Sequence, residues 1–158
     1  MTCRGGDSVL GKKFSEYVRF ERWILILIAA AFIIRMGVSA AGTPVSIARW
    51  VSINLVLLAG LIYCSVAVHT TGFGSYKQLF GLLLLQNVFA HTLIALGIAL
   101  AVVTGTDNIY TAPEFFGGSS GRNLGHAALH FIAGFIVPVF AWLVGSVILF
   151  ATKKLVRR

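Results

Sequence analysis

Residues 123–152 read NLGHAALHFIAGFIVPVFAWLVGSVILFAT, a run of 30 residues that contains no acid, no Lys and no Arg. A helix needs about 20 apolar residues to cross the hydrocarbon core of a bilayer, so this stretch predicts a membrane-spanning helix. Two histidines near its start, His126 and His130, are four residues apart and therefore share one helix face. Pro138 lies in its interior and has no N–H to donate, which predicts a kink there.

The composition of the whole chain favours the same class of protein. Of its 158 residues 58% are hydrophobic and 11% are charged, whereas a soluble domain has about 25% charged residues. A soluble protein of this length could not bury so much apolar surface in one core. We therefore predict an all-α, polytopic integral membrane four-helix bundle that forms a single membrane domain over 1–158. Its helices are expected at about 23–41, 50–69, 79–103 and 123–152, with an outer loop at 104–122.

The basic residues predict the orientation of this bundle. Ten of the thirteen Lys and Arg residues lie at 4–22, at Lys77 and at 153–158. By the positive-inside rule both termini are then cytoplasmic, in a bacterial inner membrane. The segment 12–22, KKFSEYVRFER, mixes basic and aromatic residues and is expected to lie at the interface before the first helix. No basic segment shows the pattern of a nucleic-acid groove, so nucleic acid is not an expected partner.

Polar residues inside the apolar runs point to one layer of the membrane. A rise of 1.5 Å per residue places Arg35, Asn54, His126 and His130 roughly 5–12 Å below the outer surface. An arginine at the centre of a membrane helix costs about 2.5–3.5 kcal/mol and by default marks a functional site or a buried partner. Alternatively, the Arg35 side chain extends to the outer headgroups. Acids of the outer loop could pair with Arg35 if the loop folds back, namely Asp107 or Glu114.

Histidines also suggest metal or cofactor sites. The i, i+4 spacing of His126 and His130 suits two ligands of one metal ion, although hydrogen bonds to neighbouring helices are the simpler interpretation. His91 and His130 are the candidate ligands of a haem b, with Arg35 and Asn54 completing a cofactor-binding site. Against haem, depth counting puts His91 about 8 Å deeper than His130. A quinone or ion site on helix three, at Asn87 and His91, is a weaker alternative.

The chain lacks recognisable catalytic motifs. It has no G-x-S-x-G, no H-E-x-x-H and no Walker glycine loop. Every acid lies outside the apolar runs, which argues against a proton-coupled transporter built on a buried Asp or Glu. The sequence therefore favours a non-enzymatic accessory or scaffolding subunit, whose partners are the lipid bilayer and other membrane subunits or itself. The alternative is a redox subunit that binds haem, quinone or metal, and the third possibility is an oligomeric small channel or transporter.

Overall fold

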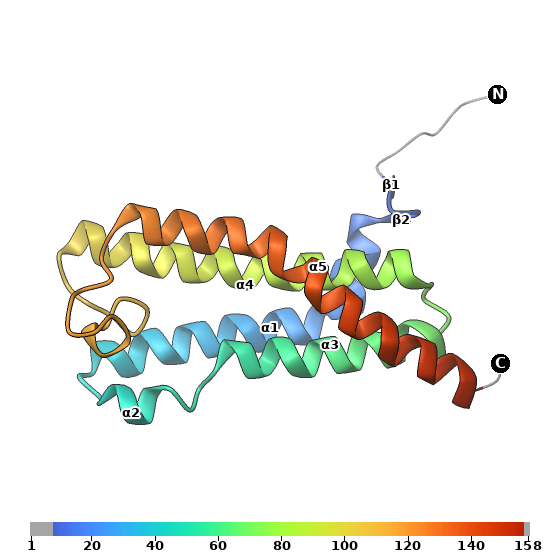
Figure 1. The fold of residues 1–158 in the computed structure, drawn as a ribbon, viewed down its shortest axis with the longest axis horizontal. Coiled ribbons are helices and arrows are strands. Elements are labelled where there is room, and N and C mark those ends of the chain that lie inside the picture. Colours follow the sequence, from blue (N-terminus) through green and yellow to red (C-terminus); the bar gives the residue numbers. More distant parts are fainter. Residues whose placement is uncertain (1–7, 157–158) are drawn as a thin grey trace.

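The computed structural model describes residues 8–156, and its architecture is helical, as predicted. Four helices, α1 (Phe14–Ala40), α3 (Ile53–Thr70), α4 (Tyr76–Thr104) and α5 (Leu124–Leu155), run along the long axis of the molecule (Figure 1). Each is long and apolar enough to cross a membrane. The remaining elements are short: β1 (Ser8–Val9), β2 (Lys12–Lys13), α2 (Val45–Ala48) and the 3₁₀ helix η1 (Pro113–Phe115).

Helix α1 begins well before the residue predicted from the sequence. It starts at Phe14 rather than at residue 23, and the Glu16 carboxylate accepts a hydrogen bond of 2.8 Å from the Lys13 backbone N–H in its first turn. The segment expected to lie at the interface is therefore largely the first turns of this helix. As a consequence Glu21, although it precedes the apolar run 23–41, belongs to a helix that is long and apolar enough to cross a membrane, and it is fully buried.

Helix α3 begins later than predicted. Pro44 precedes the short helix α2, and an extended residue, Ser52, separates α2 from α3. The long helix therefore starts at Ile53 instead of residue 50. Asn54 consequently lies in the first turn of α3, where its side chain is exposed.

Helix α5 contacts two different helices along its length. A methyl group added at Gly134 would lie only 3.1 Å from Cβ of His91, so the backbone of α5 lies directly against α4. A methyl group added at Gly145 would lie 2.7 Å from the Ser65 hydroxyl, so here α5 lies against α3. Figure 1 shows that α5 changes direction near its middle, and the buried Pro138 provides the break in the hydrogen-bond ladder.

The connecting segments lie at two opposite ends of the bundle. The β1–β2 hairpin, the turn between α3 and α4, and the end of α5 share one end in Figure 1, while α2 and the loop 105–122 share the other. In the described part of the chain the first end carries Lys12, Lys13, Lys77, Lys153 and Lys154, and the second carries Arg49 and Arg122. We call these the basic end and the loop end.

Candidate histidine site at the loop end

Three histidines lie together between α4 and α5. Nδ1 of His91 is 3.3 Å from Nδ1 of His130, which is hydrogen-bonding distance across the two helices. The ring centroids of these two histidines are 5.5 Å apart, and those of His126 and His130 are 5.0 Å apart. The depth difference of about 8 Å between His91 and His130 that the sequence suggested is therefore wrong, and His91 and His126 flank His130.

The loop 105–122 explains why the depth count failed. The loop folds back along α4, because the Asn108 side chain donates a 2.6 Å hydrogen bond to the carbonyl of Gly97. Gly97 lies seven residues before the end of α4 at Thr104, which is roughly 10 Å along a helix. The loop thus runs back beside α4, and α5 starts at a deeper level than α4 ends.

The start of α5 fixes the orientation of His126. Asn123 caps the helix by accepting a 2.7 Å hydrogen bond from the His126 backbone N–H. The ring of His126 lies against Phe116, edge to face, and its Nδ1 is 2.9 Å from the carbonyl oxygen of Gly121. Because a carbonyl only accepts, Nδ1 carries the proton and Nε2 of a neutral His126 keeps its lone pair.

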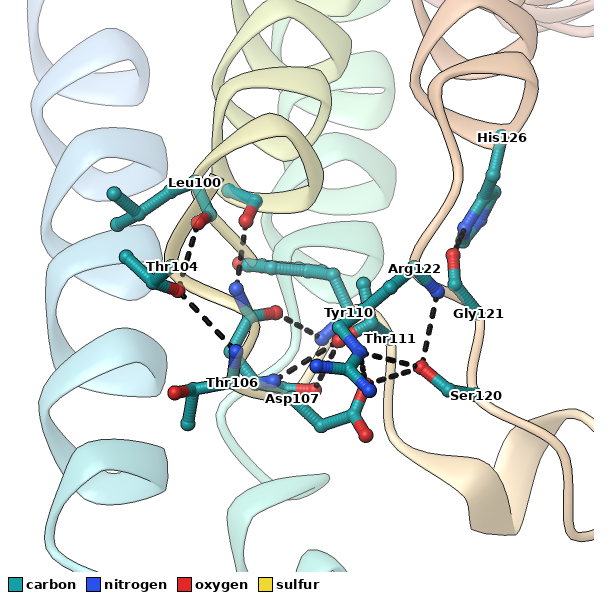
Figure 2. Close-up of polar contacts among 12 residues, drawn as sticks. Leu100, Thr104, Thr106, Asp107, Tyr110, Thr111, Ser120, Gly121, Arg122 and His126 are labelled. Atoms are coloured by element: carbon teal, nitrogen blue, oxygen red, sulfur yellow. Dashed lines mark hydrogen bonds and ion pairs between the residues drawn. The ribbon is translucent and has the colours of Figure 1, made fainter. Parts of the chain in front are cut away.

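The acids of the loop do not pair with Arg35. Asp107 forms an ion pair of 3.2 Å with Arg122, and it also accepts a 2.6 Å hydrogen bond from Ser120 (Figure 2). Glu114 is exposed and takes part in neither of the ion pairs found within residues 8–156. The suggested pairing of Arg35 with a loop acid is therefore wrong, because Asp107 closes the loop on itself.

Arg35 instead meets an aromatic residue of the loop. Its guanidinium lies 5.1 Å from the ring centroid of Tyr110, and the Phe32 ring stacks on Tyr110 at 5.8 Å between centroids. Tyr110 is one of four consecutive buried loop residues, Ile109 to Ala112, that reach between the helices. Burial raises the pKa of the Tyr110 phenol to about 12, against the lowering influence of Arg35.

The predicted polar layer thus divides into separate parts. Among the described residues, no hydrogen bond, ion pair or ring contact joins Arg35 or Asn54 to a histidine. Arg35 contacts Tyr110 of the loop, and Asn54 is exposed on α3. Only the histidines predicted as ligands are brought together, and His91 joins the His126–His130 pair.

The distance between the His91 and His130 nitrogens distinguishes a tetrahedral metal ion from a haem as the group they could bind. A metal–imidazole bond is about 2.0–2.1 Å, so two nitrogens on a tetrahedral ion are roughly 3.3–3.4 Å apart and two on opposite sides of an ion roughly 4.0–4.2 Å. The observed 3.3 Å between His91 and His130 matches the tetrahedral spacing. A haem ring would also need a slot between the helices, where Gly134 instead contacts His91. As placed, no group of three or more His, Cys, Asp or Glu side chains in residues 8–156 is arranged to hold a metal ion.

A second polar cluster escaped the sequence analysis. The thiol of Cys64 donates to Oε1 of Glu21 at 3.2 Å, while Oε2 of Glu21 has no partner. Gln86 is fully buried and neither its amide oxygen nor its nitrogen has a partner. One signal could have revealed Glu21, because it falls in helical register with the buried residues Tyr17, Ile24 and Ile28.

Three other polar side chains of the helices bond backbone carbonyls. Asn87 donates a 2.8 Å hydrogen bond to the Leu83 carbonyl of its own helix. Ser65 does the same to Leu61 at 2.7 Å. His69, at the basic end, bonds the carbonyl of Val156 at 2.9 Å. These contacts give each of these side chains a backbone partner and leave the three-histidine group and the Glu21–Gln86 region as the two candidates for chemistry.

Comparison with protein-family models, curated proteins and solved structures gave no match to the chain.

Proposed function

We propose that this chain is an integral membrane protein that binds a transition-metal ion near the loop end, through Nδ1 of His91 and Nδ1 of His130. The observation that carries the proposal is their 3.3 Å separation across two helices, which equals the spacing of two ligands on one tetrahedral ion. Imidazole suits zinc, copper, iron and nickel, which defines the class of ion.

The surroundings of the histidine pair favour this function. Polar side chains in membrane helices are costly and commonly mark functional sites. His126 lies one turn from His130, and its N–H is already bonded to a backbone carbonyl. Metal-binding histidines usually have such a bond, because it fixes the tautomer and directs the other nitrogen to the ion. Nε2 of His126 would then be the third ligand, and water or a substrate would complete the coordination.

The other functions predicted from the sequence lack a specific supporting contact. A haem b between His91 and His130 is disfavoured by their short separation and by the contact at Gly134. The accessory-subunit and oligomeric-channel roles stay predictions. Metal binding falls within the redox or ligand-binding class that the sequence allowed.

The proposed orientation puts the site on the outer side of the membrane. The concentration of lysines at the basic end favours a cytoplasmic location for that end, and with it for both termini. The three histidines and the loop 105–122 would then face the outer compartment of a bacterial inner membrane. Labelling of Ser119→Cys by a membrane-impermeant reagent added from outside supports this orientation, and labelling from the cytoplasm alone contradicts it.

Metal titration of the purified, metal-depleted protein in detergent tests the proposed function. We expect Zn²⁺ or Co²⁺ to bind with one ion per chain, and bound Co²⁺ to give the visible absorption of a tetrahedral complex. His91→Ala and His130→Ala should each abolish binding, and His126→Ala should weaken it. His69→Ala is the matched control at the basic end and should bind normally. Absence of binding to the wild-type protein, or equal loss in the His69 variant, contradicts the proposal.

A further inference from the structure

The region around Glu21 lies away from the histidines and holds an unusual combination of groups. Glu21 comes from α1, Cys64 from α3 and Gln86 from α4, and the accessible surface of Glu21, Cys64 and Gln86 is 0%. A methyl group added at Gly60 would touch both Ile24 and the Gln86 amide oxygen. Ile24 is one turn beyond Glu21 and Gly60 one turn before Cys64, so the Gln86 side chain ends within about a turn of the Glu21–Cys64 contact.

Within residues 8–156, no basic side chain balances a carboxylate at this place. The two basic residues nearest to Glu21 along α1, Arg19 and Arg22, are exposed, and Arg22 lies over the ring of Trp23. Helix α3 contains no Lys or Arg, the only one in α4 is Lys77 in its first turn, and those in α5 lie in its last turn. Neither ion pair of the described residues includes Glu21.

The atoms of this region that lack hydrogen-bond partners indicate that a proton is missing. An ionised carboxylate taken out of water without a partner is so unfavourable that such a group becomes neutral instead. Oε2 of Glu21 and Oε1 of Gln86 are both acceptors without donors, and Nε2 of Gln86 is a donor without an acceptor. A single proton on Oε2 removes the charge and at the same time supplies a donor for the Gln86 oxygen.

A metal cation would not serve the same purpose here. Hard cations such as Ca²⁺ or Mg²⁺ take six or more oxygen ligands, and this region offers two unpartnered oxygens, Glu21 Oε2 and Gln86 Oε1. The thiol of Cys64 donates to Glu21 and so adds no ligand while it is protonated. The groups present therefore match a proton better than an ion.

We infer that Glu21, Cys64 and Gln86 form a proton-binding site inside the membrane, in which Glu21 is a neutral carboxylic acid that donates to the Gln86 amide oxygen. The site binds one proton by forming an O–H bond on Glu21 Oε2 and releases the same proton when the carboxylate forms. It does not depend on the histidine site, since it involves other helix faces and no metal.

Infrared spectroscopy of the protein in lipid at neutral pH tests this inference. We expect the C=O stretching band of a protonated carboxylic acid, which Glu21→Gln removes. Glu16→Gln is the matched control, because Glu16 is an acid of the same helix that pairs with Lys12 and is only partly buried, and it should leave the band unchanged. Absence of the acid band in the wild-type protein contradicts the inference, as does its persistence in Glu21→Gln.

A second variant covers the case in which Glu21→Gln fails to fold. Gln86→Met has a similar length but no amide, so the Glu21 O–H loses its acceptor and the acid band should shift in frequency. Asn87→Leu is the control, since Asn87 is also buried on α4 but bonds the carbonyl of Leu83. An unshifted band in Gln86→Met contradicts the hydrogen bond to Gln86. Metal binding by His91 and His130 should be unaffected in Gln86→Met.

Discussion

The histidine site and the Glu21 site differ in how their polar groups are satisfied. At the loop end, His91 meets His130 across two helices and Asp107 meets Arg122 within the loop. In the interior, Glu21 accepts one hydrogen bond from Cys64, while its Oε2 and both amide atoms of Gln86 have no partner. The loop end is therefore held by contacts between complementary groups, whereas the Glu21 site needs an added proton to become complementary.

We expect the largest effect of a single substitution in the loop 105–122. Tyr110→Ala removes a buried ring that contacts both Phe32 and Arg35, and truncation of a buried aromatic residue costs about 3 kcal/mol. We expect a loss of this size in the free energy of unfolding, measured by denaturant titration in detergent. Phe115→Ala, in the same loop but 52% exposed, is the control and should change stability by less than about 0.5 kcal/mol.

The same pair of variants distinguishes the two sites. If the loop determines the level at which α5 begins, Tyr110→Ala should also weaken metal binding by the histidines and leave the Glu21 infrared band in place. Equal loss of both signals would mean that the bundle responds as one unit and that the two sites are not independent.

A smaller effect is expected where α4 and α5 touch. A side chain at Gly134 would meet His91 Cβ at 3.1 Å and the backbone of Val88 at 3.3 Å, so Gly134→Val should separate the helices. Overpacking of this kind typically costs about 1–3 kcal/mol. Gly37→Val is the control, because nothing lies within 4 Å of a methyl group at Gly37. Normal zinc affinity in the Gly134 variant would show that the histidine pair does not depend on this close contact.

The smallest predicted effect is a pH dependence of the loop end. The pKa of Tyr110 is raised from 10.0 to about 12 in the folded protein, so its phenol stays neutral where an unfolded tyrosine loses its proton. Its contribution to stability is complete below pH 10 and is lost as the pH rises toward 12. Ultraviolet titration should show a component near pH 12 that Tyr110→Phe diminishes. The same late component in Tyr110→Phe would contradict this assignment.

Much of the fold followed from the sequence, because long apolar runs between polar segments have few alternatives. The relative depths of His91 and His130 did not follow from the sequence, because depth counting assumes that each loop begins at the membrane surface. The hydrogen bond from Asn108 to Gly97 breaks that assumption and depends on a tertiary contact that no local pattern encodes. The burial of Glu21 was not predicted for a different reason. Charged residues on both sides of it suggested a segment outside the first helix, whereas α1 begins at Phe14.

The nitrogen-to-nitrogen contact between α4 and α5 is the central claim, and solid-state NMR of protein with ¹⁵N-labelled histidine in lipid tests it most directly. We predict a through-space correlation between the Nδ1 atoms of His91 and His130, which disappears in His91→Ala and remains in His69→Ala. Imidazole resonances of His91 and His130 that show no mutual correlation would contradict the claim. The doubled-back loop and the shared metal site would then both have to be abandoned.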